Sequence, residues 1–414
     1  MIIKFHENKS FFEGVCIEDL IKSQKTPFYL YSQQHIENTY KNLKNTLNSE
    51  IFYAVKANSN QSILKIMKNC GSGADVVSSG ELKRSLEAGF DPSKIIYEGV
   101  GKSEEDIRYA IKKKIRFINV ESLYEIKLIN KIGKDINEII NIGIRLNPDI
   151  DGKTIDKITT GKKTDKFGIS IDQISNNISE IKSYKHVNIK GISCHVGSQI
   201  QNLKIFRNVF TTMKKTADDF SSLGMNIEHI DLGGGFSINY DSDINELDIK
   251  GIGELVTEIF NRSNYKISFE PGRYLVAKSG IIITKILTCK ENGGINFLII
   301  DAGMQTLIRP AMYGALHRVE ALNNFKNEKC NYTVAGPICE SSDIIAKHIL
   351  LPKQKINNYL LIHDVGAYGA VMASNYNSRG IPAEILVNRN KFFIIHQEEK
   401  ISDIIKRDDI PDWL

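Results

Sequence analysis

Lys56 is the residue in this chain with the clearest potential for chemistry. It follows the apolar, strand-forming run 51–55 and precedes a polar turn. A lysine at the end of a buried strand has apolar walls around its stem, which can lower the pKa of the ammonium and free a nucleophilic amine. On this segment alone, the commoner situation is a lysine whose charged head stays in water. The interpretation therefore depends on the other motifs.

Three consecutive glycines, Gly233 to Gly235, end another apolar segment. Glycines let backbone amides close on an anion such as a phosphate, although they also form tight turns. Ser198 could add a hydroxyl to the same phosphate. His195 could stack on the ring of an aromatic cofactor, or it could be an ordinary core histidine.

Glu270 follows the apolar segment 267–269, so its carboxylate should be buried. A buried carboxylate needs a charged or protonated partner, because leaving water is costly for a lone charge. A protonated pyridine nitrogen would be such a partner. The same segment continues through a proline and a glycine to Arg273.

A second group of candidate residues lies in the last third of the chain. Cys339 and Glu340 place a thiol beside a carboxylate, and a structural loop is the alternative there. Tyr368 stands between glycines, which suggests a close approach of the backbone to another group. Arg309 and Tyr313 offer a guanidinium and a phenol four residues apart. Arginine suits bidentate capture of a carboxylate, whereas a surface ion pair is the simpler alternative.

The elements that must position these residues follow one pattern from about residue 51 to residue 272. A short apolar strand ends in polar or glycine residues, and an amphipathic helix follows. Eight such units in about 220 residues are the expectation for an α/β fold of the (β/α)8 TIM-barrel type, whose active site collects at the carboxyl ends of its strands. A doubly wound open sheet is the competing topology. The predicted strands are 51–58, 74–78, 95–100, 117–121, 141–147, 189–198, 229–236 and 266–271.

The pattern changes after Pro271. Strand-like segments with short turns predict a C-terminal, mostly antiparallel β domain, which the segment 28–31 is expected to join. We therefore expect a barrel domain of residues 32–275 and a β domain made of residues 1–31 and 276–414. The predicted strands of the β domain are 281–288, 296–300, 332–335, 359–363, 384–387 and 391–396.

Composition excludes several classes of protein. The 414 residues are 42% hydrophobic and 25% charged, which is typical of a soluble globular protein. The formal net charge of +5 gives no reason to propose nucleic acid as a partner. No apolar run approaches the roughly 18 residues that span a bilayer. None of the six cysteines forms a Cys-x-x-Cys pair, so no metal is expected, and their sparse use fits the cytoplasm.

One apparent motif is rejected. Gly99, Gly101, Lys102 and Ser103 look like part of a P-loop, but the position that requires its first glycine is Ile96.

Taken together, eight segments in order resemble the fold type III pyridoxal-phosphate decarboxylases, and among them those that act on meso-2,6-diaminopimelate. Any one of the segments is weak evidence, whereas the ordered set covers most of the chain and is highly specific. The resemblance implies an alanine-racemase-like fold, pyridoxal 5′-phosphate as cofactor, and formation of L-lysine and CO2 as the last step of lysine biosynthesis. The segments are 53–58, 166–169, 195–198, 231–236, 270–273, 309–313, 336–341 and 366–369.

The resemblance also implies a role for each candidate residue. Lys56 would hold the cofactor covalently, Glu270 would pair with its ring nitrogen, and His195 would stack on its ring. Cys339 would act as general acid, and it would come with Glu340 from the neighbouring subunit of a homodimer. The implied cofactor-binding set is Lys56, Asp75, His195, Ser198, Gly234, Gly235, Glu270, Pro271, Gly272, Arg273 and Tyr368, and the implied substrate-binding set is Arg273, Arg309, Tyr313, Glu340 and Tyr368.

Three alternatives share parts of this pattern. A decarboxylase of a basic amino acid or of carboxynorspermidine could use the same scaffold, but Arg309 together with Glu340 argues against it. An amino-acid racemase should lack the segment around Cys339 and carry a tyrosine as second base. A regulator without catalysis should not have kept Lys56, Glu270 and Cys339 together.

Overall fold

The computed structural model describes the chain except residues 1–2, 7–8, 153–159, 241–245 and 323–327. It divides into two compact units. The β unit comprises Met1–Asn38, Asn239–Asn245 and Val276–Leu414, and the barrel unit comprises Thr39–Ile238 and Glu246–Leu275.

The barrel unit is built on eight parallel strands in a closed ring. Each strand pairs with the next one along the chain, and β13 pairs back to β5, which closes the ring. A two-residue strand, β10 (Ile169–Ser170), adds to β9. The predicted (β/α)8 barrel is therefore confirmed, and an open doubly wound sheet is excluded. The ring strands are β5 (Glu50–Ala54), β6 (Gly73–Val76), β7 (Ile95–Tyr97), β8 (Phe117–Val120), β9 (Ile140–Asn147), β11 (Val187–Ser193), β12 (His229–Asp231) and β13 (Lys266–Phe269).

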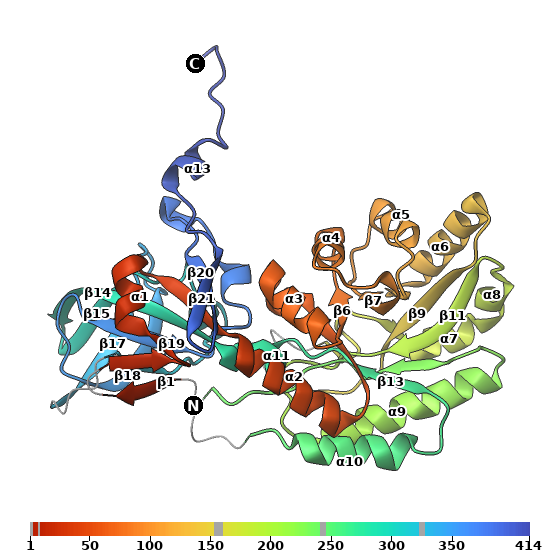
Figure 1. The fold of residues 1–414 in the computed structure, drawn as a ribbon. Helices are drawn as coiled ribbons and strands as arrows, with labels where there is room; N and C mark the ends of the chain where they lie inside the picture. Colours follow the sequence, from red (N-terminus) through yellow and green to blue (C-terminus); the bar gives the residue numbers. More distant parts are fainter. Residues whose placement is uncertain (1–2, 7–8, 153–159, 241–245, 323–327) are drawn as a thin grey trace. The chain divides into compact units, whose positions relative to one another are not determined.

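Helices flank these strands on the outside of the ring (Figure 1). Their starts follow the expected capping chemistry: Asn60 accepts a hydrogen bond from the amide of Ser62 at 2.9 Å, and Ser103 and Asp106 form a reciprocal capping box. The helices are α2 (Gln33–Leu47), α3 (Gln61–Asn69), α4 (Ser79–Glu87), α5 (Glu104–Lys112), α6 (Leu123–Ile136), α7 (Ile171–Asn176), α8 (Ile178–Ser183), α9 (Leu203–Ser222) and α10 (Ile249–Phe260).

The start of α4 resembles a capping box but differs from one in a single detail. Ser78 accepts from the amide of Glu81, but the carboxylate of Glu81 accepts from the amide of Val77. The carboxylate therefore reaches one residue further back than a capping box requires.

The β unit contains a mostly antiparallel sheet, as predicted. Strand β4 (Phe28–Ser32) pairs antiparallel with β14 (Gly280–Asn292), so the segment 28–31 does join this sheet. Two pairings, β4 with β20 and β15 with β17, are parallel. The other strands of this sheet are β15 (Ile295–Ile300), β16 (Val319–Ala321), β17 (Lys329–Ala335), β18 (Ile344–Pro352), β19 (Tyr359–His363), β20 (Ala383–Asn388) and β21 (Lys391–His396).

Some elements of the β unit were not predicted. A small three-stranded sheet forms from β1 (Ile3–His6), β2 (Lys9–Phe12) and β3 (Val15–Cys16), and β16 and β18 were also missed. These strands are short or show no regular alternation of buried and exposed residues. The short helices are α1 (Ile17–Ser23), α11 (Arg273–Val276), α12 (Arg309–Tyr313) and α13 (Ile401–Ile405).

None of the described helices is long and apolar enough to cross a membrane. In the same residues, no group of three or more histidine, cysteine, aspartate or glutamate side chains is arranged to hold a metal ion.

Candidate active site

Lys56 lies where the first barrel strand ends, but not within the strand as predicted. Strand β5 stops at Ala54, and a single 3-10 turn (Val55–Ala57) carries the lysine beyond it. Its Nζ lies 3.2 Å from Oδ2 of Asp75, which stands on the neighbouring strand β6. The lysine side chain is 41% exposed, whereas Asp75 is fully buried. The amine is therefore held by a buried carboxylate and remains accessible.

The glycine triplet lies against two neighbouring loops at the same end of the barrel. A Cβ atom on Gly233 would lie 2.3 Å from the carbonyl oxygen of Cys194, and one on Gly235 would lie 2.2 Å from that of Gly197. Both glycines have positive φ angles. On Gly234, a Cβ would lie 2.3 Å from the carbonyl oxygen of Glu270. No side chain fits at these positions, so the triplet forms a close-packed backbone cradle.

Polar groups that suit an anion surround this cradle. A guanidinium nitrogen of Arg273 donates to Oγ of Ser198 at 3.2 Å. The amide of Gly234 donates to Nδ1 of His195 at 3.3 Å. Partial burial lowers the pKa of His195 well below its usual value, and the nearby positive charges of Lys56 and Arg145 add to the effect. The imidazole is therefore neutral at physiological pH.

Glu270 is buried at the end of β13, as predicted. Its side-chain atom Oε1 has no hydrogen-bond partner among the described residues. Burial raises the pKa of this carboxyl well above its usual value, and the carboxylates of Asp231, Asp75 and Glu98 raise it further. The unpaired acceptor matches the expectation that Glu270 requires a cationic or protonated partner.

Several buried charged residues in the barrel were not predicted. Arg145 on β9 donates to Oε1 of Glu121 at 2.9 Å and lies 3.6 Å from Oε2 of Glu98. Its guanidinium also lies 4.9 Å from the ring centroid of Phe167. Glu98 in turn accepts hydrogen bonds from Asn119 and, at 3.0 Å, from Ser193. A sequence signal existed, because Arg145 interrupts the otherwise apolar run 142–146 of this strand.

The rejected P-loop segment has a structural role instead. The side chain of Lys102 is 1% exposed, and its Nζ lies 3.5 Å from Glu125 and 2.6 Å from the carbonyl oxygen of Gly99. The lysine fixes the turn that follows β7, so its ammonium is engaged within the fold and this segment is not a phosphate site.

In the β unit, Arg309 begins helix α12 and is buried. Its Nη1 lies 2.7 Å from Nε2 of His317, and its guanidinium stands 4.8 Å from the ring centroid of Tyr240. The other ring nitrogen of His317 lies 2.8 Å from the carbonyl oxygen of His363. The carbonyl can accept only a proton on Nδ1, so Nε2 is the atom that accepts from Arg309. Tyr313, at the end of the same helix, is half-buried.

Cys339 and Glu340 lie in an exposed loop that follows β17. Asp343 shapes this loop, because its carboxylate accepts from the amides of Ile338 at 2.8 Å and Met304 at 2.6 Å. The loop also contacts the 3-10 helix Tyr376–Ser378: the amide of Cys339 donates to Asn377 at 3.3 Å, and the hydroxyl of Tyr376 donates to Glu340 at 2.5 Å. The thiol and the carboxylate are thus presented at the surface of the β unit.

Tyr368 has a φ of 56°, a conformation that non-glycine residues rarely adopt. A Cβ on the preceding Gly366 would lie 1.9 Å from the carbonyl oxygen of Val276. The predicted close backbone approach around Tyr368 is therefore present.

The structure thus brings the predicted residues together in two groups. Lys56, Asp75, His195, Ser198, Gly233–Gly235 and 270–273 gather at the carboxyl ends of the barrel strands, whereas Arg309, Tyr313, Cys339, Glu340 and Tyr368 belong to the β unit.

Comparison with known proteins identifies the family. Residues 33–277 match the model of the pyridoxal binding domain of pyridoxal-dependent decarboxylases. Diaminopimelate decarboxylase of Vibrio cholerae is 36% identical over 395 residues, which are 95% of this chain and 94% of that protein. The Zymomonas mobilis enzyme is 34% identical over 412 residues, covering 97% of this chain and 98% of that protein.

Solved structures give the same result. The M. jannaschii diaminopimelate decarboxylase in complex with L-lysine has a TM-score of 0.94 and 33% identity, and covers 100% of this chain and 98% of that one. The Helicobacter pylori enzyme complexed with L-lysine has a TM-score of 0.91 and 36% identity over 94% of this chain and 98% of that one. Pyridoxal phosphate is the family's cofactor, and the alanine-racemase-like fold expected from the sequence is confirmed. The chain therefore belongs to the pyridoxal-dependent decarboxylases and, within them, to the diaminopimelate decarboxylases.

Proposed function

We propose that this chain converts meso-2,6-diaminopimelate into L-lysine and CO2 with pyridoxal 5′-phosphate, as a cytoplasmic homodimer whose active sites combine residues of both subunits. The observation that supports this most directly is the buried carboxyl of Glu270, whose Oε1 has no hydrogen-bond partner among the described residues, at the barrel end that also carries Lys56 and the glycine cradle. An aldehyde, a phosphate and a basic ring nitrogen each find a matching group there.

The residues of the barrel unit fit the cofactor. Lys56 would bind the cofactor covalently, and the carboxylate of Glu270 would accept a hydrogen bond from the protonated ring nitrogen. When bound, the cofactor supplies an electron sink for the carbon that loses CO2. The phosphate would lie against Ser198, the backbone of the glycine cradle and the turn of Gly272 and Arg273, since glycine leaves the backbone amides uncovered and Arg273 donates to Ser198 beside them. Pro271 and Tyr368 complete the proposed cofactor-binding set.

Two further residues of this site would position the Lys56 amine and contact the face of the cofactor ring. Asp75 holds the Lys56 amine in position through their 3.2 Å contact. Its carboxylate supplies a counter-charge whenever the amine is protonated. His195 is neutral because the pKa of its imidazole is depressed. A neutral ring can stack on the cofactor without adding a second positive charge beside Lys56.

Substrate recognition would fall to the second group. A substrate with a carboxylate at both ends requires a cation for the end that is kept, and Arg309, Arg273 and the phenol of Tyr313 would supply this contact. Glu340 would hold the distal ammonium. Cys339 would donate a proton to the carbon that has lost CO2, acting as general acid. Because Cys339 and Glu340 are exposed, they are accessible to a neighbouring subunit.

Incubation with single substrates tests the proposal. Purified protein with added pyridoxal phosphate is given meso-diaminopimelate, ornithine, arginine or lysine, and CO2 and the amine product are measured. We expect CO2 and L-lysine from meso-diaminopimelate and at most trace turnover of the others. Preferential release of putrescine from ornithine would instead assign the chain to the diamine-forming decarboxylases.

Arg309→Ala is expected to raise KM for meso-diaminopimelate about 10- to 100-fold, the effect of losing a charge-assisted contact of about 1.5–3 kcal/mol. The absorbance band of bound cofactor should not change. Arg309→Lys is the matched variant, because it keeps the charge but loses the forked geometry. Its KM should lie between those of the wild type and Arg309→Ala. Equal loss of cofactor binding and substrate binding in Arg309→Ala would contradict a role in substrate recognition.

Cys339→Ala is expected to lower kcat by about 10²- to 10³-fold, within the range for loss of a general acid, and to leave cofactor binding intact. Cys289→Ala is a suitable control because Cys289 is also exposed and lies elsewhere in the β unit, on β14. If both variants retained full turnover, protonation by Cys339 would be ruled out.

A further inference from the structure

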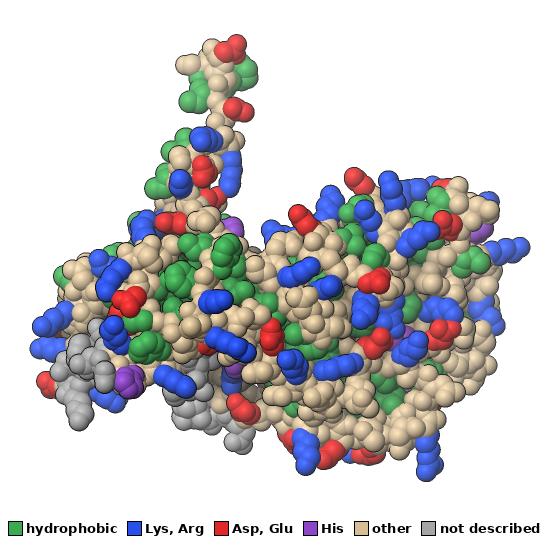
Figure 2. Space-filling view, in the orientation of Figure 1, with side chains coloured by type: hydrophobic (Ala, Val, Ile, Leu, Met, Phe, Trp, Pro, Cys, Tyr) green, Lys and Arg blue, Asp and Glu red, His purple; other side chains and the backbone are tan. Residues whose placement is uncertain are grey.

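The residues 401–414, called here the C-terminal arm, leave the β unit and extend away from its body (Figure 1). The arm begins with the five-residue helix α13 and continues through a turn in which the amide of Leu414 donates to Pro411 at 3.2 Å. Apolar side chains lie along its surface (Figure 2). The most exposed are Ile410 at 85%, Trp413 at 82% and Leu414 at 91%.

This concentration of exposed apolar side chains is unusual within the described chain. Five large hydrophobic residues of the arm are exposed, and the three in its second half are the most exposed large hydrophobic residues of the part of the chain that the structure describes. Single exposed apolar residues are normal on protein surfaces, whereas a contiguous group marks an interaction site. The five are Ile401, Ile405, Ile410, Trp413 and Leu414.

The arm is anchored at its root and unattached at its tip. Glu399, just before α13, accepts hydrogen bonds from the side chains of Asn375 and Arg407, and its amide donates to Ile381 at 2.9 Å. The backbone of Gly380 approaches Glu399 so closely that a Cβ there would lie 2.0 Å from the Glu399 carbonyl oxygen. Among the described residues, the recorded hydrogen bonds of 408–414 all stay within the arm.

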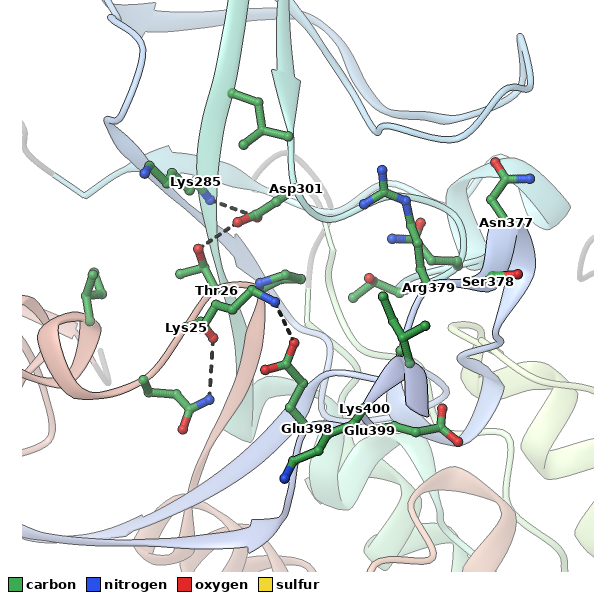
Figure 3. A pocket seen from close by; sticks show the side chains of 18 of the residues that line it. Lys25, Thr26, Lys285, Asp301, Asn377, Ser378, Arg379, Glu398, Glu399 and Lys400 are labelled. Carbon is green, nitrogen blue, oxygen red and sulfur yellow. Dashed lines mark hydrogen bonds and ion pairs between the residues drawn. The ribbon is translucent and has the colours of Figure 1, made fainter. Parts of the chain in front are cut away.

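The root of the arm is continuous with the loop that carries Cys339 and Glu340. The same 375–380 segment that anchors Glu399 also contacts the loop, through Asn377 to Cys339 and Tyr376 to Glu340. A groove of about 1010 Å³ lies beside the arm root, and its lining includes Asn377, Ser378 and Arg379 as well as Glu398, Glu399 and Lys400 (Figure 3). The arm therefore leaves from the edge of the β unit that presents the thiol and carboxylate.

We propose that the C-terminal arm docks on the neighbouring subunit of the homodimer and that the apolar side chains of Ile410, Trp413 and Leu414 anchor it there. The inference rests on the proposed function, because that function assigns the loop of Cys339 and Glu340 to the active site of the partner. An arm that starts beside this loop extends along the same interface. Docking removes the exposed apolar surface from water, and that removal stabilises the dimer. The arm also holds in place the segment that supports Cys339.

Trp413 is the only tryptophan in the chain, so its fluorescence reports on the arm alone. In the intact dimer we expect the short-wavelength emission of a buried indole, and on dilution to monomers a shift to the long-wavelength emission of a hydrated one. The shift should coincide with the change of mass measured by analytical ultracentrifugation. A long-wavelength emission in the dimer, or a buried emission that persists in the monomer, would overturn the proposal.

The double substitution Ile410→Asp with Leu414→Asp keeps the tryptophan and removes the apolar anchor. We expect the dissociation constant of the dimer to rise at least tenfold and the emission to shift to long wavelength. Cofactor binding by Lys56 should remain. Turnover should fall at low protein concentration and recover at high concentration. Ile139→Asp is the matched control: Ile139 is 66% exposed and precedes the amino end of β9, so neither dimer nor emission should change.

These outcomes separate the two proposals. If the wild-type dimer converts meso-diaminopimelate and the double-substituted protein has the same dimer dissociation constant, the arm inference alone is overturned. A wild-type protein that binds cofactor but has no decarboxylase activity, or is active as a monomer, overturns the proposed function.

Discussion

Lys56→Ala is expected to abolish decarboxylation, with kcat lowered by about 10³-fold or more, the scale seen when a covalent catalytic group is removed. Lys56 is the described lysine whose amine lies 3.2 Å from the buried Asp75, at the barrel end that also carries Glu270. Without it the cofactor can be held only by non-covalent contacts. The absorbance band of lysine-bound cofactor should disappear, and borohydride should no longer fix the cofactor to the protein.

Removal of the amine also lowers the stability of the fold, and the experiment must distinguish this effect from the loss of catalysis. Asp75 is fully buried, and a buried carboxylate without its cation destabilises the fold. Lys56→Arg controls for this, because it keeps a positive charge near Asp75 but cannot bind the aldehyde in the same way. We expect Lys56→Arg to unfold near the wild-type temperature and still to lack turnover. Retained turnover in either variant would mean that another residue binds the cofactor.

The position of Lys56 also illustrates how far a sequence predicts a fold. The alternation of apolar strands and amphipathic helices predicted all eight barrel strands, because burial on both faces leaves a clear apolar signal. Seven of their eight ends were predicted too late: the segment 51–58, for example, forms a strand only to Ala54, whereas the end of β9 at Asn147 was predicted correctly. A ring strand ends where its neighbours stop pairing with it, and pairing partners are not visible in the strand's own residues.

The candidate site was predictable to the extent that its residues stand in local motifs. Lys56, Glu270 and the glycine triplet each belong to a short segment with a recognisable pattern. The pairing of Glu98 with Arg145 and Ser193 was not predictable, since Ser193 lies 95 residues away from Glu98 in sequence. Only the closed ring brings these strands together, and only then does the excess of buried carboxyls become apparent.

The excess of buried carboxyls determines which of these groups are protonated in the cofactor-free barrel. Burial raises the pKa of Glu270, that of Glu98, and that of Asp231 to about 7. The charges of Asp231 and Glu98 raise the pKa of Glu270 further, and the charge of Glu98 raises that of Asp231. For such a group the native state binds a proton more tightly than the unfolded state does. Stability is therefore greatest below the ordinary carboxyl pKa and falls as pH rises above it. A bound ring nitrogen that carries a proton would supply the missing positive charge.

Glu270→Gln is therefore expected to have opposite effects on the cofactor-free and cofactor-bound protein. Without cofactor, the variant should be more stable than wild type from neutral to mildly alkaline pH, because it removes one carboxyl that cannot ionise freely when buried. The difference should shrink as pH falls towards 4 and vanish below about pH 3, where this carboxyl is protonated in both states. With cofactor, the variant should lose turnover by about 10²- to 10³-fold, since a preorganised electrostatic partner is missing, and should bind the cofactor more weakly.

Thermal unfolding measured across pH, with and without cofactor, tests both effects on one pair of proteins. Glu254→Gln is the control, because Glu254 is an exposed acid on the outer helix α10 and its substitution should leave both curves unchanged. A Glu270→Gln protein that is less stable than wild type at alkaline pH without cofactor would show that Glu270 is ionised and paired in the empty barrel. The unpaired Oε1 would then not be the group that keeps the cofactor ring electron-poor. A gain in stability together with a loss of turnover is expected only if burial destabilises the ionised carboxyl in the cofactor-free site and the bound cofactor stabilises it.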